Sequence, residues 1–292
     1  MKLKASKHSS SLKSKLGLPA VLFACSFFFV AGFFFSSFLS QDASGLRQGP
    51  RMLESVNEER AVMPRGETGD DSFTTISFQV LSWVPRALYF PNFAPAEHCQ
   101  SVIEMAKIGL KPSTLALRKG ETADNTKGIR TSSGMFISAS EDKTGILDII
   151  EEKIARATML PRTHGEAFNV LRYEVGQRYN SHYDAFHPAE YGPQKSQRVA
   201  SFLLYLSDVE EGGETMFPFA LVQDGENMDG SYDFRKCTGL KVKPRRGDGL
   251  LFYSLLPNGT IDPTSLHGSC PVIRGEKWVA TKWLRDQEQE DE

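Results

Sequence analysis

The sequence has 292 residues, 40% of them hydrophobic, and a formal net charge of −2. A chain of this length can bury one large core or two small ones. Its balanced charge excludes the strongly basic class of proteins that is typical of nucleic-acid binding, and its composition is that of a chain that folds over most of its length.

The first feature along the chain is an apolar run over residues 16–39 that no charged residue interrupts. About 20 such residues span the hydrocarbon core of a bilayer as a helix. Residues 1–15 carry five lysines and no acidic residue, so this basic tail is expected to stay in the cytoplasm while the rest of the chain enters the lumen. The pattern predicts a single-pass, type II signal anchor.

A cleaved signal peptide is the alternative reading of the same run. Its apolar region is usually about 7–15 residues long and ends at small residues near a cleavage site. The run here is longer, and residues 36–40 make only a passable cleavage site. The length favours an uncleaved anchor and leaves cleavage open.

Three regions follow the anchor. Residues 40–72 are polar, mixed in charge and without apolar periodicity, which indicates a flexible lumenal stem. Apolar character returns for residues 73–285, about one domain in size. Residues 286–292 form an acidic tail that we expect to be unstructured.

The domain opens with two expected helices and continues with short strands. Pro95 favours a helix start, followed by apolar residues at helical spacing, and a second apolar stripe follows an acidic opening at residues 141–142. The two stripes are Cys99, Val102, Ile103 and Ala106, and Ile146, Ile149, Ile150 and Ile154. Strands are expected at 168–173, 199–206, 250–253 and 278–283, separated by glycine-rich turns. This α+β pattern predicts a β-sandwich or jelly roll with helices packed outside it.

Three cysteines lie beyond the anchor, in what would be an oxidising lumen. Cys237 and Cys270 flank strands of the C-terminal half, which favours them as a disulfide pair over either pairing with Cys99, although reduced cysteines stay an alternative. Asn258 begins an Asn-Gly-Thr sequon on a turn, which predicts N-glycosylation of an exposed lumenal loop.

The residues that indicate chemistry start with His182 and Asp184. They are two apart, so on an extended chain both side chains leave one face. His267 is the natural third ligand. Two histidines and one carboxylate leave three positions of an octahedral metal open, which suits Fe(II) that binds a co-substrate and O2.

Lys277 strengthens this reading. It lies ten residues after His267 among Trp278, Val279 and Ala280. A lysine on an inward face needs an anion, and the distal carboxylate of 2-oxoglutarate would satisfy it. A zinc hydrolase could use the same three ligands but would not explain Lys277.

Several motifs in order resemble the prolyl 4-hydroxylases, and most closely the short, membrane-anchored plant type. The similarity covers residues 85–284, nearly the whole folded unit. It is carried by residues 173–184, 205–215, 244–248, 267–272 and 275–278.

This resemblance implies a double-stranded β-helix (jelly roll) with supporting helices. It implies His182, Asp184 and His267 as the iron ligands, and Lys277 with Tyr173 as the residues that bind 2-oxoglutarate. Arg198, Glu174 and Trp283 would lie near the peptide-binding groove. The cofactors implied are Fe(II), 2-oxoglutarate, O2 and L-ascorbate.

The implied reaction converts peptidyl proline to 4-hydroxyproline while 2-oxoglutarate is decarboxylated to succinate, the procollagen-proline 4-dioxygenase type of activity. The implied partners are proline-rich secretory proteins and the membrane of the endoplasmic reticulum or Golgi. Homo- or hetero-oligomers with related hydroxylases stay open. A hydroxylase of another residue and a catalytically inactive peptide-binding module of the same fold are the alternatives.

Four other polar residues are expected to have no role in the chemistry. His98, His164 and His187 lack partners at ligand spacing, although His187 could line the mouth of the site. Glu214 resembles a general base, but the chemistry above needs none, so we expect it to serve a turn or strand pairing.

Overall fold

The computed structural model describes residue 26, residues 75–220, residue 233 and residues 235–289. The predicted basic tail, signal anchor and stem therefore lie almost entirely outside the described residues. No helix within the described part of the chain is long and apolar enough to cross a membrane. The described residues from 75 onward belong to one compact unit.

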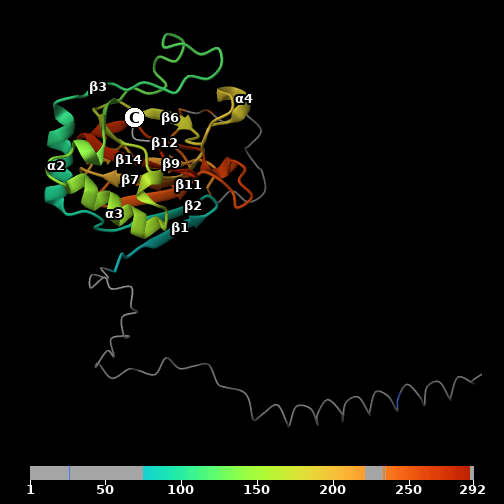
Figure 1. The fold of residues 1–292 in the computed structure, drawn as a ribbon. Coiled ribbons are helices and arrows are strands. Elements are labelled where there is room, and N and C mark those ends of the chain that lie inside the picture. Colours follow the sequence, from blue (N-terminus) through green and yellow to red (C-terminus); the bar gives the residue numbers. More distant parts are fainter. Residues whose placement is uncertain (1–25, 27–74, 221–232, 234, 290–292) are drawn as a thin grey trace, which may run out of the picture. The chain divides into compact units, whose positions relative to one another are not determined.

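Strands dominate this unit, and two longer helices cover one side of its largest sheet (Figure 1). The strands are β1 (Gln79–Trp83), β2 (Arg86–Phe90), β3 (Lys111–Pro112), β4 (Ser133–Ile137), β5 (Phe168–Tyr173), β6 (Tyr179–His182), β7 (Arg198–Tyr205), β8 (Glu211–Gly212), β9 (Thr215–Phe217), β10 (Leu240–Val242), β11 (Gly249–Tyr253), β12 (His267–Ser269), β13 (Val272–Arg274) and β14 (Lys277–Arg285). The helices are α2 (Ala96–Lys107), α3 (Ile146–Thr158) and the short α4 (Pro188–Tyr191), with 3₁₀ turns at Ala139–Glu141, Arg162–His164 and Pro263–Ser265.

The strands form two facing sheets and a small third one. The large sheet has the order β1-β2-β11-β7-β14-β5-β4-β3, the second has β10-β9-β12-β6, and β13 pairs with β8. Every strand pair is antiparallel, so neighbouring strands present side chains alternately to the two faces. This is the jelly-roll type of architecture that the sequence predicted.

Alternation along β14 separates two cores. Trp278, Ala280 and Leu284 join the core under α2 and α3. Val279 joins the core between the two facing sheets, and Lys277 lines a cavity on that inner side. The inner face of the central strands therefore faces the functional site, and the outer face anchors the helices.

The first expected helix is confirmed. Helix α2 begins after Pro95, and its buried residues are the four apolar residues of the predicted stripe. Proline fits this position because the first helical N–H groups have no partner within the helix.

The second helix is confirmed with one error. Ile150 and Ile154 are buried as predicted, but Ile149 is 54% exposed and Leu147 takes the inward position. The acidic opening also differs from the prediction, because Glu141 closes a separate 3₁₀ turn. Asp142 accepts a hydrogen bond from the backbone N–H of Leu147, 2.8 Å away, at the start of α3.

The four expected strands exist with ends within two residues of the prediction, as β5, β7, β11 and β14. The sequence analysis did not predict the hairpin of β1 and β2, nor strand β4 at the other end of the large sheet. The predicted unstructured tail is wrong at its start. The N–H of Asp286 donates to the carbonyl of Gln197 (3.0 Å), and the N–H of Gln289 donates to that of Thr163 (2.7 Å).

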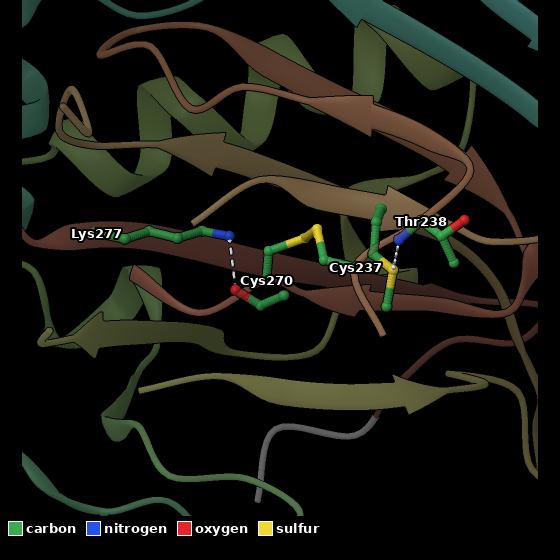
Figure 2. The surroundings of a disulfide bond; sticks show 6 residues. Cys237, Thr238, Cys270 and Lys277 are labelled. Carbon is green, nitrogen blue, oxygen red and sulfur yellow. Dashed lines mark hydrogen bonds between the residues drawn. A yellow bond between two sulfur atoms is a disulfide. The ribbon is translucent and has the colours of Figure 1, made fainter. Parts of the chain in front are cut away.

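Cys237 and Cys270 form a disulfide with a Cα–Cα distance of 5.4 Å, the pairing favoured from the sequence. Cys99 is free and buried. Figure 2 shows the disulfide beside Lys277, because Cys270 directly follows the end of β12. The covalent link therefore fastens the end of a strand that carries site residues.

Candidate metal centre and substrate groove

His182 and His267 lie directly opposite each other where β6 pairs with β12. Their ring centroids are 4.4 Å apart. Asp184 follows the end of β6, and its carboxylate oxygens lie 3.5 Å from Nε2 of His182 and 3.6 Å from Nε2 of His267. The three donor atoms lie within 4.8 Å of one another, so the structure brings the three predicted ligands together.

Both imidazoles are oriented by backbone carbonyls. Nδ1 of His182 lies 2.9 Å from the carbonyl of Asn180, and Nδ1 of His267 lies 3.0 Å from that of Ser265. A carbonyl accepts only, so each Nδ1 carries the proton and each Nε2 offers its lone pair to the centre. This arrangement is typical of metal-binding histidines.

The charges of the centre also suit a cation. Burial lowers the pKa of His267 to about 4, so its ring is neutral at physiological pH. Burial alone would raise the pKa of Asp184, but its electrostatic interactions with His267 and His182 outweigh burial and hold this pKa well below its usual range. Two imidazoles that each turn Nε2 to the centre, together with one carboxylate, fit a divalent iron ion.

Lys277 and Tyr173 enter a small cavity next to this centre. The cavity, about 40 Å³, is lined by both residues together with His182, Asp184 and His267. Lys277 is 1% exposed, and its ammonium group donates to the hydroxyl of Ser269 at 3.0 Å (Figure 2). Burial lowers the pKa of Lys277 to about 7, opposed by the charge of Glu214. A buried ammonium beside a metal centre fits the distal carboxylate of 2-oxoglutarate.

A larger groove of about 880 Å³ opens beside the metal centre. Arg198 and Trp283 line it, and the guanidinium carbon of Arg198 lies 3.7 Å from the centroid of the Trp283 ring. Glu166 holds Arg198 through two hydrogen bonds of 2.6 Å, from Nε and Nη2. Arg285 donates to the same carboxylate at 2.7 Å. Arg198 is therefore fixed in place at the groove wall.

Glu174 departs from the expectation that it lies near the peptide groove. Its side chain is 55% exposed and lies 3.3 Å from the guanidinium of Arg172. It lines neither the groove nor the small cavity. Tyr173, the last residue of β5, faces inward, so the next residue points to the other side.

The histidines that were set aside stay outside the site. His164 contacts the carbonyl of Arg285 through Nδ1 at 3.0 Å, and Nδ1 of His187 accepts from the N–H of Ala189 at 3.3 Å. His187 does not line the groove, although Phe186 and Tyr191 do. The carbonyl of Glu214, in the turn before β9, accepts from the N–H of Cys270 at 2.9 Å, and the charge of its side chain acts on Lys277.

Comparisons with known proteins agree with this geometry. The 2OG-Fe(II) oxygenase superfamily matches residues 168–285. The probable prolyl 4-hydroxylase 9 of Arabidopsis thaliana is 66% identical over 289 residues, which cover 98% of this chain and 99% of the relative. Prolyl 4-hydroxylase 13 of the same plant is 57% identical over 276 residues, 94% of this chain and 97% of the relative.

The chain belongs to the prolyl 4-hydroxylase family.

A solved structure supports the fold of this family member. A truncated form of the viral collagen prolyl hydroxylase of Paramecium bursaria Chlorella virus-1 matches with a TM-score of 0.50 and 23% identity. The match covers 75% of this chain and 99% of the viral chain. Family membership implies Fe(II), 2-oxoglutarate and O2, for which the residues described above provide fitting ligands.

The sequence analysis did not identify several residues that contact the metal ligands and Lys277 in this prolyl 4-hydroxylase family member. The ring of Tyr179 stacks on His182 with centroids 3.6 Å apart, and the guanidinium of Arg130 lies 4.8 Å from the centroid of Tyr179. Ser269 contacts Lys277, and Ser201 contacts Asp184. Tyr179 and Ser269 stand inside the motifs that carry the resemblance, so their positions beside His182 and His267 were the available signal. Arg130 and Ser201 stand in no motif.

Proposed function

We propose that this chain is a prolyl 4-hydroxylase that uses Fe(II), 2-oxoglutarate and O2 to hydroxylate proline in a peptide. The observation that carries the proposal is the juxtaposition of the His182–Asp184–His267 centre with the buried ammonium of Lys277. A metal centre alone fits many reactions. A buried cation next to it selects an anionic co-substrate that reaches the metal.

The balanced reaction consumes one 2-oxoglutarate, one O2 and one prolyl residue, and yields succinate, CO2 and one 4-hydroxyprolyl residue. Iron supplies the oxidising chemistry when it is bound. His182, Asp184 and His267 would hold it while leaving three coordination positions for the co-substrate and O2.

The residues around the centre bind, orient and exclude water. Lys277 and Tyr173 would hold the distal carboxylate of 2-oxoglutarate, which directs the keto-acid end toward the metal. Leu171, Leu203 and Val279 line the same cavity with apolar surface, so water has little room beside the bound co-substrate.

The groove suits an extended, proline-rich peptide. Proline-rich segments adopt the polyproline II conformation and pack on aromatic side chains. The groove provides Phe136, Phe186, Tyr191 and Trp283, with Arg198 fixed over the Trp283 ring. An arginine that stacks on an aromatic ring can donate hydrogen bonds to the peptide carbonyls of such a segment.

The location of the enzyme follows from sequence features that lie mostly outside the described residues. Residues 16–39 would anchor the chain as a type II protein of the endoplasmic reticulum or Golgi membrane, with the catalytic unit in the lumen. Asn258 is exposed on a turn, as a glycosylated asparagine needs to be. L-ascorbate would keep the iron reduced.

Translation with microsomes tests the proposed topology. A lumenal unit is protected from protease and shifts in mass when Asn258 is glycosylated, and an Asn258→Gln chain does not shift.

The test of the activity uses residues 73–292 with Fe(II), 2-oxoglutarate, ascorbate and a proline-rich peptide, and follows succinate and peptide mass. Succinate together with hydroxyproline, both absent in His182→Ala, is the expected result. Succinate with no oxidised peptide would indicate another substrate. A folded protein with no iron-dependent turnover would point to an inactive peptide-binding module.

A further inference from the structure

Ser201 is a buried polar residue in the middle of strand β7. Its neighbours in the strand are apolar, and it is 0% exposed. Burying a hydroxyl without a hydrogen-bond partner costs about 1–3 kcal/mol in proteins. A serine here therefore needs a partner, and strand alternation turns it to the same inner face as Leu203 and Tyr205.

The partner of Ser201 is the metal-ligand candidate Asp184. The Ser201 hydroxyl donates to Oδ2 of Asp184 at 2.5 Å. This is a charge-assisted hydrogen bond between two buried groups, and such bonds are short and strong. β7 belongs to the large sheet and Asp184 follows β6 of the second sheet, so the bond also joins the two sheets at the metal centre.

The two oxygens of Asp184 would otherwise be close to equivalent toward a metal. Oδ1 lies 3.5 Å from Nε2 of His182, and Oδ2 lies 3.6 Å from Nε2 of His267. With this placement the carboxylate can bind a metal through one oxygen or chelate it through both. The hydrogen bond from Ser201 to Oδ2 removes the equivalence.

We propose that Ser201 is a positioning residue that keeps Asp184 a single-oxygen ligand by holding Oδ2. The inference rests on the proposed function, because its consequence concerns the open positions of the iron. Two histidines and one carboxylate oxygen leave three positions, enough for both oxygens of the keto-acid end and for O2. A chelating carboxylate takes a fourth position and competes with 2-oxoglutarate.

The test compares Ser201→Thr with Ser201→Val in the full-length protein. The two side chains have the same shape, so any packing penalty is shared and the difference between them is the hydroxyl group. The readout is the visible charge-transfer absorption of the anaerobic Fe(II) and 2-oxoglutarate complex, titrated with 2-oxoglutarate. This signal reports chelation by the keto acid and needs no turnover or peptide.

We expect the Val variant to bind 2-oxoglutarate about 10- to 100-fold more weakly than the Thr variant, the range typical when a hydrogen bond to a metal ligand is lost. Ser254→Ala is the matched control for loss of a buried hydroxyl. The Ser254 hydroxyl is buried and has no hydrogen-bond partner within the described residues, so this variant is expected to titrate like the wild type.

Equal affinities in the Thr and Val variants would overturn the inference, because the hydroxyl would then have no effect on the open positions. It is also overturned if the Thr variant folds and the Val variant does not, since the hydroxyl would then serve the fold itself. The proposed function fails separately, when the wild-type protein shows the absorption but oxidises no proline.

Discussion

Lys277 of β14 pairs directly with Tyr173 of β5, and its ammonium nitrogen lies 5.5 Å from the centroid of the tyrosine ring. No carboxylate forms an ion pair with Lys277 within the described part of the chain, and its hydrogen bond goes to the neutral hydroxyl of Ser269. A buried ammonium that no carboxylate contacts directly can bind an anionic ligand.

Lys277→Met is therefore expected to raise the KM for 2-oxoglutarate about 10- to 100-fold, since a hydrogen bond to a charged group contributes about 1.5–3 kcal/mol. Lys282→Met is the matched control. Lys282 is equally buried in the same strand, but it faces the helices and pairs with Glu151 of α3. This control should lower stability and leave the KM unchanged. Equal effects in the two variants would show that Lys277 acts through the fold.

The pH dependence of co-substrate binding should follow Lys277. Its pKa is lowered by burial to about 7, and a bound carboxylate would raise it again. Below pH 7 the ammonium is already charged, so affinity is constant with respect to this group. Above pH 7 binding takes up a proton, so affinity falls as pH rises. Calorimetry with Mn(II) in buffers of different ionisation enthalpy should detect uptake of about one proton at pH 8 and little at pH 6. Absence of uptake at pH 8 would contradict this assignment.

Arg198→Lys should raise the KM for peptide about 10-fold or more and leave that for 2-oxoglutarate unchanged. Lysine cannot reproduce the two hydrogen bonds to Glu166 or the stacking on Trp283. Glu174→Ala is the control, because that carboxylate is exposed and lies outside the groove. If the KM for peptide changes in Glu174→Ala and not in Arg198→Lys, the peptide binds outside the groove that Arg198 lines.

The double variant Cys237→Ser, Cys270→Ser is expected to lose about 3–4 kcal/mol of stability, the chain-entropy estimate for a sequence separation of 33 residues. For a unit of this size the melting temperature should fall by about 10 °C. Calorimetry with and without reductant measures it, and reductant should have no further effect on the variant. Cys99→Ala, at the free cysteine, should keep the sensitivity to reductant. An unchanged melting temperature in the double variant would show that the disulfide does not contribute to the stability of the folded unit.

Local periodicity was sufficient for much of the fold. The stripe of α2 was found because its buried residues recur at helical spacing, and the long strands were found because they are nearly continuous buried apolar runs. The error at Ile149 has a simple origin. The predicted stripe with Ile149 and the observed stripe with Leu147 share Ile150 and Ile154, and only the position of the sheet decides between them. The β1–β2 hairpin escaped because its half-buried residues do not alternate cleanly.

The ligands of the metal centre were found through motif similarity, since His267 is far from His182 in sequence and becomes its neighbour only when β12 pairs with β6. Ser201 could not be found this way. A serine in an apolar run carries no sign of its partner until the sheets face each other. Glu174 was misplaced because proximity to Tyr173 in sequence does not give proximity in space when side chains alternate.

Side chains of β14 alternate between the cavities and the core under the helices, and this alternation has an evolutionary consequence. Lys277 and Trp283 line the cavities, while Trp278 and Ala280, which lie between them in the strand, pack in the core under the helices. Point substitutions can thus alter one face and spare the other. Insertion or deletion of one residue inside the strand would exchange the two faces at once, turning a lysine into the helix layer and a tryptophan into the co-substrate pocket. Lineages that carry this enzyme should therefore accept length changes in the loops around β14 and almost never within it.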